Sequence, residues 1–177
     1  MYIVLCEDLA TFGPELDRGR QLLVDMANAI VEARGPDAPS RMTDALTLLI
    51  RSADRQIQGE EALMEAAAFG RSAPHRRRHR QFVERLAEVQ RSLSAQQDIV
   101  AAQLALHHVF LHWVRDHVQR DDARLARWLD KRRDRLARKE EEAQDSILWA
   151  RQRRPELRSS VPGAACVGWA QRGTAAK

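Results

Sequence analysis

The stretch SAPHRRRHRQFVERLAEV (residues 72–89) decides the fold, because it combines a helical period with polar residues at core positions. Its apolar stripe, read at helical spacing, consists of His75, His79, Phe82, Leu86 and Val89. Pro74 lies in the first turn, where proline favours a helix start. The two histidines therefore share the inward face one turn apart, where buried polar side chains need partners.

Three further amphipathic helices are expected around this one. The first runs from Pro14 to about Arg34, the second from just after Ser40 to about Phe69, and another follows Ser94. Short links between long helices favour antiparallel neighbours. The sequence therefore predicts an all-α, up-down-up-down four-helix bundle.

The bundle is expected over residues 1–125, and two other segments follow it. Residues 126–154 have high helix propensity and excess positive charge, which predicts a basic amphipathic helical extension. Residues 155–177 are rich in Ser, Gly, Ala and Pro without periodicity, which predicts a disordered tail. The segment 123–150 has an apolar face, and we expect that face to pack on the bundle or to pair with another chain. This face contains Leu125, Trp128, Leu129 and Leu136.

The composition excludes several classes of protein. No apolar stretch approaches the ~18 residues of a membrane-spanning helix, and the first ten residues lack the basic start of a signal peptide. Cys6 and Cys166 form no pattern, so we expect a cytoplasmic chain without a disulfide scaffold. The net charge is only +4, because 25 acids lie among 29 bases. Nucleic-acid binding through the extension is thus a weaker alternative.

Every helix of the expected bundle carries polar residues on its apolar stripe. In an antiparallel bundle such residues can meet in one layer, where a metal ion satisfies carboxylates and neutral imidazoles together. Three imidazoles with one or two carboxylates suit iron, with zinc or manganese as alternatives. Asp122 follows His117 by five residues, so a regular helix would turn it away by about 140° unless the helix loosens there. The stripe residues are Arg20, Gln56, Glu60, His75, His79 and His117.

These residues make the chain resemble the hemerythrin family of non-haem di-iron proteins. The family has Asp-x-x-His on the first helix, His-Phe-x-x-Glu-Glu on the second, then His-x-x-x-His and His-x-x-x-x-Asp. The resemblance implies a hemerythrin-like bundle in which His75, His79 and His117 hold one iron. It also implies that Glu60 and Asp122 are the bridging carboxylates. The matching stretches are LDRGRQLLVDMAN (16–28), DRQIQGEEALM (54–64), HRRRH (75–79) and WVRDHVQRDD (113–122).

Two positions depart from the family pattern. Arg20 and Gln56 stand where the family has the histidines of the second iron, at which dioxygen binds. Arginine is a permanent cation and cannot ligate a divalent ion, so we expect one iron per chain rather than two. The Arg20 guanidinium could bridge Glu60 and Asp122 in place of the metal. Alternatively, Arg20 points outward, and Gln56 is either a weak ligand or a hydrogen-bonded core amide.

The expected function is non-haem iron binding, in metal handling or in sensing of dioxygen, nitric oxide or redox state. No nucleophile elbow, P-loop or Rossmann fingerprint occurs, and we expect no enzymatic activity. The alternative is a metal-free bundle that serves as a structural or protein-interaction module. The run Arg76–Arg78 is expected to face solvent mostly. Three histidines off the stripe are expected at the surface or in helix packing: His107, His108 and His112.

Overall fold

The computed structural model of the chain describes residues 3, 14–35 and 37–153, and these residues contain helices and no strand. The segment predicted to be a disordered tail lies outside them. In chain order the helices are α1 (Pro14–Glu32), α2 (Ala38–Ala66), α3 (Ser72–Gln96), α4 (Ile99–His112), the π-helix η1 (Trp113–Asp122) and α5 (Ala123–Arg153).

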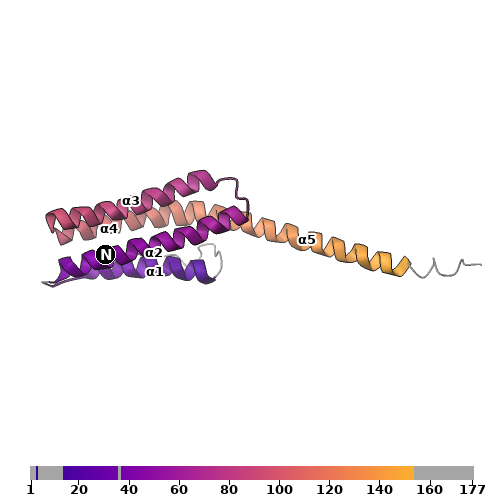
Figure 1. Ribbon diagram of the computed structural model, residues 1–177, viewed down its shortest axis with the longest axis horizontal. Coiled ribbons are helices and arrows are strands. Elements are labelled where there is room, and N and C mark those ends of the chain that lie inside the picture. The colour runs from indigo at the N-terminus through magenta and orange to yellow at the C-terminus, as the bar shows by residue number, and fades with distance from the viewer. Residues whose placement is uncertain (1–2, 4–13, 36, 154–177) are drawn as a thin grey trace, which may run out of the picture. The chain divides into compact units, whose positions relative to one another are not determined.

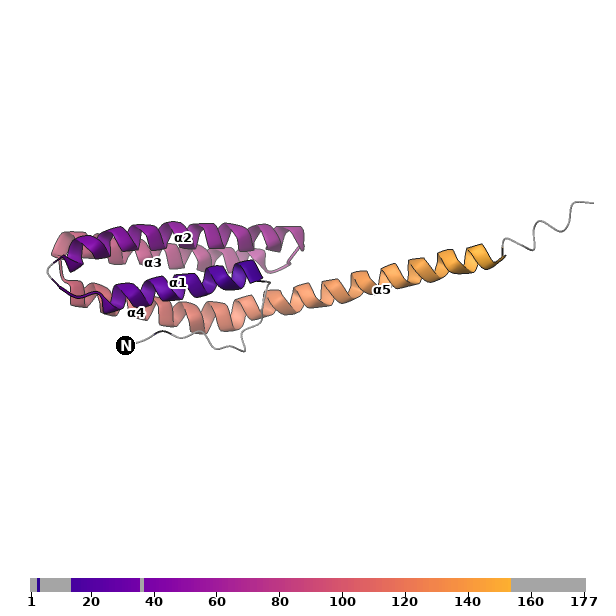
Figure 2. The ribbon, with the colours of Figure 1, turned by 90° about the horizontal axis from the view of Figure 1, so that it is seen from below.

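Helices α1 to α4 form a bundle in which each helix packs on two others. Helix α1 contacts α2 and α4, and α3 contacts the same two helices, so the four close a ring. They lie side by side along a common direction in both ribbon views (Figures 1 and 2). The connections span only residues 33–37, 67–71 and 97–98. The prediction of an all-α, up-down-up-down bundle is confirmed.

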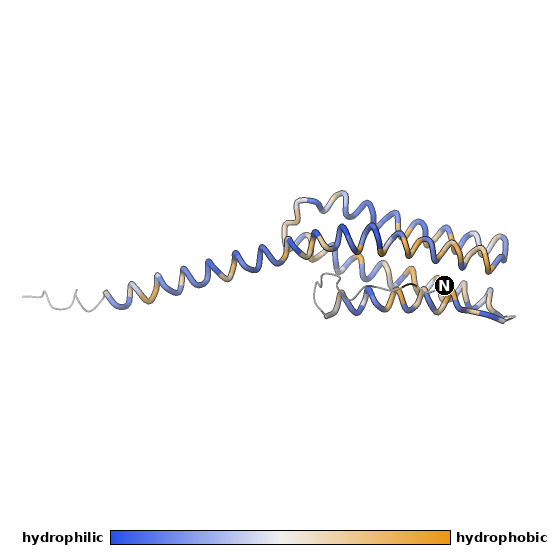
Figure 3. Tube along the Cα trace, turned by 180° about the vertical axis from the view of Figure 1, so that it is seen from behind, coloured by the Kyte–Doolittle hydropathy of each residue, from blue (hydrophilic) through white to orange (hydrophobic). Residues whose placement is uncertain are grey.

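The apolar stripes of the four helices meet in a continuous core. Aromatic rings fill its part next to the polar stripe residues: Phe82 of α3 stacks on Trp113 at a centroid distance of 4.9 Å, and Phe110 contacts both rings edge-on. Hydrophobic and hydrophilic residues alternate along the four bundle helices (Figure 3). The core also includes Ile3, whose backbone N–H and carbonyl both bond the Asn28 side chain at 2.9 Å.

Two helix boundaries differ from the sequence-based expectation. Helix α3 continues through Ser94 to Gln96, because the left-handed residue Gln97 (φ 53°) ends it and Asp98 caps α4 by accepting from the Ala101 N–H at 2.9 Å. Helix α2 begins at Ala38 and not just after Ser40, so Ser40 lies inside it. Pro39 occupies the first turn, a position that proline tolerates.

The first turns of α5 close the end of the bundle where α2 meets α3. Leu125 is fully buried with Met64 and Phe69, and Trp128 and Leu129 pack against this second apolar cluster. The indole of Trp128 and the guanidinium of Arg132 donate to the Ala67 carbonyl at 3.2 and 2.9 Å. These bonds satisfy a carbonyl that the end of α2 leaves without a helical partner.

A second compact unit begins at Arg135, and the structure describes it as the helix α5 up to Arg153. Every side chain described from Arg135 to Gln152 is exposed. The tube of α5 is mainly hydrophilic, with isolated hydrophobic stretches (Figure 3). Of the helices described, none combines the length and the apolar character that crossing a membrane requires.

Candidate metal centre

Four buried side chains from three helices converge in the interior of the bundle. Glu60 comes from α2, His75 and His79 from successive turns of α3, and His117 from η1. Each is at most 4% exposed, and one donor atom from each lies within 4.8 Å of all the others. The i, i+4 spacing on α3 places its two imidazoles on one face, as the sequence predicts, and the rings meet edge to face with centroids 4.7 Å apart.

The π-helix η1 brings a fifth group, Asp122, to the same point. A π-helix closes its turns with bonds between residues five apart, so the side chains of His117 and Asp122 stand on one face. The Nε2 atom of His117 lies 3.0 Å from Oδ1 of Asp122, which is 1% exposed. The rotation of about 140° that a regular α-helix would impose is therefore absent.

The donor atoms approach one another closely without hydrogen-bond alignment. Oε1 of Glu60 lies 2.6 Å from Nε2 of His75 and 3.4 Å from Nε2 of His79, and Oδ1 of Asp122 lies 3.4 Å from Nε2 of His75. Within the described residues, none of these four atoms has an aligned hydrogen-bond partner. Buried polar atoms that point to one shared position are what a metal ion would satisfy.

The buried charges perturb one another strongly. Burial alone would raise the pKa of Glu60, but the close contacts with His75 and His79 hold that pKa well below its ordinary value. Burial opposes protonation of His75, yet the contacts with Asp122 and Glu60 raise its pKa to about 9. Burial and the charge of Glu60 raise the pKa of Asp122 to about 7. Burial holds the pKa of His117 well below its usual range, so its ring stays neutral.

A buried guanidinium occupies the other side of Asp122. Arg20 of α1 is 3% exposed, and its Nη2 atom lies 3.3 Å from Oδ2 of Asp122. The outward-pointing alternative for this residue is therefore wrong. Its other ion pair with a described side chain is to Asp17 on the same helix, at 3.4 Å. Arg20 was expected to bridge Glu60 and Asp122. It pairs with Asp122 as expected, but its second carboxylate partner is Asp17 and not Glu60.

Gln56 bonds to the backbone of the neighbouring helix. Its Nε2 atom donates to the Leu16 carbonyl at 2.8 Å. Of the two alternatives for Gln56, a weak ligand or a hydrogen-bonded amide, the structure therefore shows the hydrogen-bonded amide. Its Oε1 atom lies against Gly19, where an added Cβ would come within 1.9 Å of it. Gln56 therefore fastens α2 to α1 at a point where α1 has no side chain.

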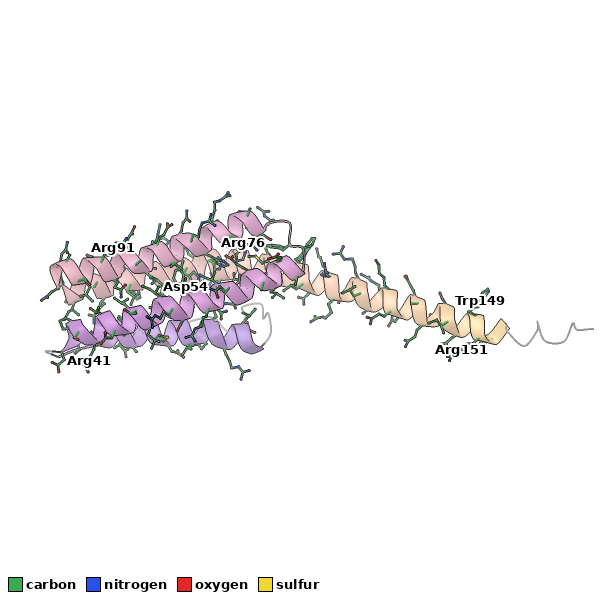
Figure 4. The ribbon with its side chains drawn as sticks, viewed as in Figure 1. Arg41, Asp54, Arg76, Arg91, Trp149 and Arg151 are labelled. Carbon is green, nitrogen blue, oxygen red and sulfur yellow. The ribbon has the colours of Figure 1, made fainter. Side chains whose placement is uncertain are left out.

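A third carboxylate, that of Glu61, lies beside the site and was not among the predicted site residues. Oε1 of Glu61 lies 2.9 Å from Nδ1 of His79, on the ring nitrogen opposite the cluster. Arg76 faces the same carboxylate at 3.4 Å from the outside of the bundle, where Figure 4 labels it. A carboxylate on the outer nitrogen fixes the tautomer and orientation of an imidazole. The Glu-Glu pair of the family pattern is the signal that could have identified Glu61.

Two small clefts reach the histidines from the surface. One, of about 140 Å³, reaches His117 past Phe82 and Trp113, and the other, of about 70 Å³, reaches His75 past Phe69. Arg78 lines both and pairs with the buried Asp121 at 2.6 Å. The run Arg76–Arg78 was expected to face solvent mostly. Two of its arginines, Arg76 and Arg78, form ion pairs beside the site.

The remaining histidines lie away from the cluster. His108 and His112 are exposed, as the surface alternative predicts. His107 is 3% exposed and takes part in helix packing, and its Nδ1 atom has no hydrogen-bond partner in the described part of the chain.

The comparison with known proteins agrees with this geometry. The hemerythrin HHE cation-binding domain matches residues 15–129, a span that contains every residue of the cluster. Bacteriohemerythrins from Pseudomonas paraeruginosa and Pseudomonas aeruginosa are 25% identical to the chain over 122 residues, which cover 69% of this chain and 78% of each relative. The chain therefore belongs to the hemerythrin HHE cation-binding family.

Proposed function

We propose that the chain binds a single non-haem iron ion through Glu60, His75, His79 and His117, with Asp122 beside it. Three imidazole nitrogens and a carboxylate oxygen form a donor set that suits iron, with zinc or manganese as alternatives. Metal–ligand distances of about 2.1 Å place two ligands of one ion at most about 4.2 Å apart. The donor atoms lie within 4.8 Å of one another, so a small contraction would bring them into range.

The observation that carries a single-metal site is the buried ion pair between Arg20 and Asp122. In the family pattern the position of Arg20 holds a histidine of the second iron. A permanent cation there repels a second divalent ion and compensates Asp122 without one. Gln56, at the other substituted position, gives its amide hydrogen to the Leu16 carbonyl. Neither residue offers the imidazole that a second iron would need.

The proposed role is metal handling, or sensing of dioxygen, nitric oxide or redox state. The clefts that reach His75 and His117 measure about 70 and 140 Å³. One molecule of liquid water takes up about 30 Å³, so the two clefts have room for about two and about five molecules of that size. Diatomic ligands therefore fit both clefts. The curated relatives are named bacteriohemerythrins, which supports a binding role rather than an enzymatic one.

A metal-free module is the second candidate, and the ion pairs of the cluster favour it. Glu60 contacts His75 at 2.6 Å, and Arg20 contacts Asp122 at 3.3 Å, so opposite charges meet without an added cation. Such a buried network holds the helices in one register whether or not a metal binds.

Metal analysis separates the two candidates. The full chain is purified without added metal, and a second sample is reconstituted anaerobically with ferrous iron before desalting. We expect about one tightly held iron per chain in the reconstituted sample. Two irons with an oxo-bridge absorption band would overturn the single site. No retained metal in either sample would establish the metal-free module. A spectral change of the iron-loaded protein with nitric oxide or dioxygen would then support sensing over metal handling.

A further inference from the structure

A cleft of about 380 Å³ lies between the end of α1, the start of α2 and the first half of α4. We call it the α1–α4 cleft. It lies beside the connection from α1 to α2, whereas the metal cluster lies near the other end of the bundle, where α3 begins. Figure 4 labels Arg41 near the first of these ends and Arg76 near the second. The volume falls within the range of about 300–1,000 Å³ that small-molecule sites occupy.

The walls of the α1–α4 cleft are apolar and carry no acid. Val31 and Ala38 line it from α1 and α2, and Ile99, Val100 and Leu104 line it from α4. Val100 is 65% exposed and Leu104 is 49% exposed, so apolar surface continues to the mouth. None of the described lining residues is acidic, and α4 contains no Asp, Glu, Lys or Arg. Such walls favour the apolar part of an organic molecule and do not repel an anion.

A guanidinium is held at the edge of the cleft. Arg34 lines the cleft just after the end of α1, and its Nη1 atom donates to the Val31 and Ala33 carbonyls at 2.8 Å each. The same atom reaches Oε1 of Gln103 at 3.4 Å. Within the described residues, Arg34 forms no ion pair, and Nη1 makes all the hydrogen bonds of its guanidinium. The N–H groups of Nε and Nη2 therefore remain for a ligand, and this edge of a guanidinium binds a carboxylate in two parallel bonds.

A buried imidazole lines the same cleft. His107 is 3% exposed, and in the described part of the chain its Nδ1 atom has no hydrogen-bond partner. It follows Gln103 by one turn of α4, and Gln103 contacts Arg34, so the three side chains form a polar row. The Gln103 amide is occupied, because it donates to the Ile30 and Ala33 carbonyls at 3.1 and 2.9 Å. A buried polar atom without a partner is unfavourable, and a ligand that bonds Nδ1 would remove that cost.

We propose that the α1–α4 cleft binds a medium-chain aliphatic carboxylate. The carboxylate lies on Arg34 and accepts a hydrogen bond from His107 in the neutral tautomer that carries its proton on Nδ1. The alkyl chain lies along Val100 and Leu104. At about 30 Å³ for a group the size of a water molecule, the cleft has room for about twelve such groups, and octanoate has about ten non-hydrogen atoms. This site uses no residue of the metal centre, so it is a second function of the bundle.

Calorimetric titration of the full chain with sodium octanoate tests the proposal. We expect saturable binding of one octanoate per chain, with a dissociation constant on the order of 100 µM. The comparison ligand is 1-octanol, which keeps the alkyl chain and lacks the charge, and it should bind at least about tenfold more weakly because it forms no ion pair with Arg34. Equal affinity for the two ligands would overturn the proposal. No octanoate binding at about 5 mM, about fiftyfold above the expected constant, would overturn it as well.

Two exposed leucines locate the site. Leu104 lines the α1–α4 cleft and is 49% exposed, whereas Leu48 is 54% exposed and lines a neighbouring cleft of about 450 Å³ between α1 and α2. Leu104→Asp replaces apolar wall with a negative charge and should weaken octanoate binding at least about tenfold. Leu48→Asp is the matched control and should change it less than about twofold. The opposite result would assign octanoate to the neighbouring cleft and overturn the proposal.

Three further variants test the recognition of the carboxylate. Arg34→Gln should lower the affinity for octanoate to that for 1-octanol, and Arg41→Gln is its control, because Arg41 lines only the neighbouring cleft. His107→Leu should weaken octanoate binding, and His107→Asn should restore it, because the asparagine amide can donate from near the position of Nδ1. Circular dichroism and iron content identify variants that keep the bundle intact. Unchanged octanoate affinity in folded Arg34→Gln and His107→Leu would overturn the proposal, whatever the outcome for the metal.

Discussion

The two sides of Asp122 compensate buried carboxylate charge in opposite ways. On one side, three imidazoles from α3 and η1 converge with Glu60 and leave room for a cation from solution. On the other side, Arg20 of α1 carries the cation on the chain itself. Buried carboxylates of one bundle thus meet imidazoles on one side and the guanidinium of Arg20 on the other.

The largest expected effect is loss of the metal from the histidine side. His79→Ala removes one of three imidazoles, and in the described bundle no other histidine lies near enough to replace it. We expect metal content to fall from about one ion per chain to near zero. His108→Ala, an exposed imidazole change outside the cluster, is the control and should retain the ion. Equal metal content in both variants would place the site elsewhere.

The next effect is gain of a metal on the arginine side. Arg20→His with Gln56→His removes the cation beside Asp122 and adds two imidazoles at the positions where the family has them. Only the double variant should bind a second iron and change its absorption with oxygen. Arg20→His alone supplies one imidazole, and Gln56→His alone keeps the repelling guanidinium. A folded double variant that still binds one ion would show that α1 and α2 are not in the register needed.

A smaller effect is expected from the carboxylate behind His79. Glu61→Gln keeps the size of the side chain but weakens its hold on the Nδ1 atom of His79, which lies 2.9 Å away. Removal of such a partner lowers metal affinity by about 10–100-fold. Titration with a competing chelator measures this change. Glu65→Gln is the control, because Glu65 is exposed and only reaches Arg76 at 3.7 Å.

Two glycines sharpen the assignment of Gln56 as a packing residue. Gly59→Ala should stabilise the bundle by about 0.5–1 kcal/mol, because its Cβ would meet only Leu16 at 3.4 Å. Gly19→Ala should not stabilise the bundle. Its Cβ would displace the Gln56 amide and break the hydrogen bond to the Leu16 carbonyl, at a cost of about 1 kcal/mol that offsets the gain in helix propensity. Urea unfolding measures both. Adding Gln56→Ala to Gly19→Ala should leave the metal content unchanged.

The smallest effect concerns the buried histidine outside the cluster. Burial lowers the pKa of His107, so the folded chain takes up its proton less readily than the unfolded chain does. Stability should therefore decline as pH falls through about 6.5, the pKa of an unperturbed histidine. His107→Leu should reduce the difference between urea midpoints at pH 7.5 and 5.5. His108→Leu changes an exposed ring and should leave the difference nearly intact.

Periodicity and residue type predict most of the bundle and the convergence of its polar stripe. The stripes that carry Arg20, Glu60 and His75 are read directly from 3.6-residue spacing, and all three side chains are buried where the period places them. The position of Asp122 could not be predicted this way. Its inward direction depends on the wide turns of η1, and a regular helix would turn it aside.

Contacts between side chains on different helices could not be predicted from helical periodicity either. Glu61 lies outside the inward stripe of α2, and only the packing of α2 on α3 brings it to His79. The acid that completes the pairing of Arg20 depends on rotamers, which periodicity does not specify: Asp17 lies one turn away on the same helix. Arg78 likewise reaches Asp121 across the contact between α3 and η1.

The π-helix has a consequence for insertions and deletions in this segment. An α-helix brings side chains four residues apart onto one face, whereas His117 and Asp122 are five apart, so η1 holds one residue more than the site requires. Deleting the exposed Gln119 would let the segment wind as an α-helix with both side chains still on one face. Among aligned relatives, a one-residue gap here is therefore compatible with an unchanged centre. A three-residue gap would leave the two residues two apart and turn the carboxylate away.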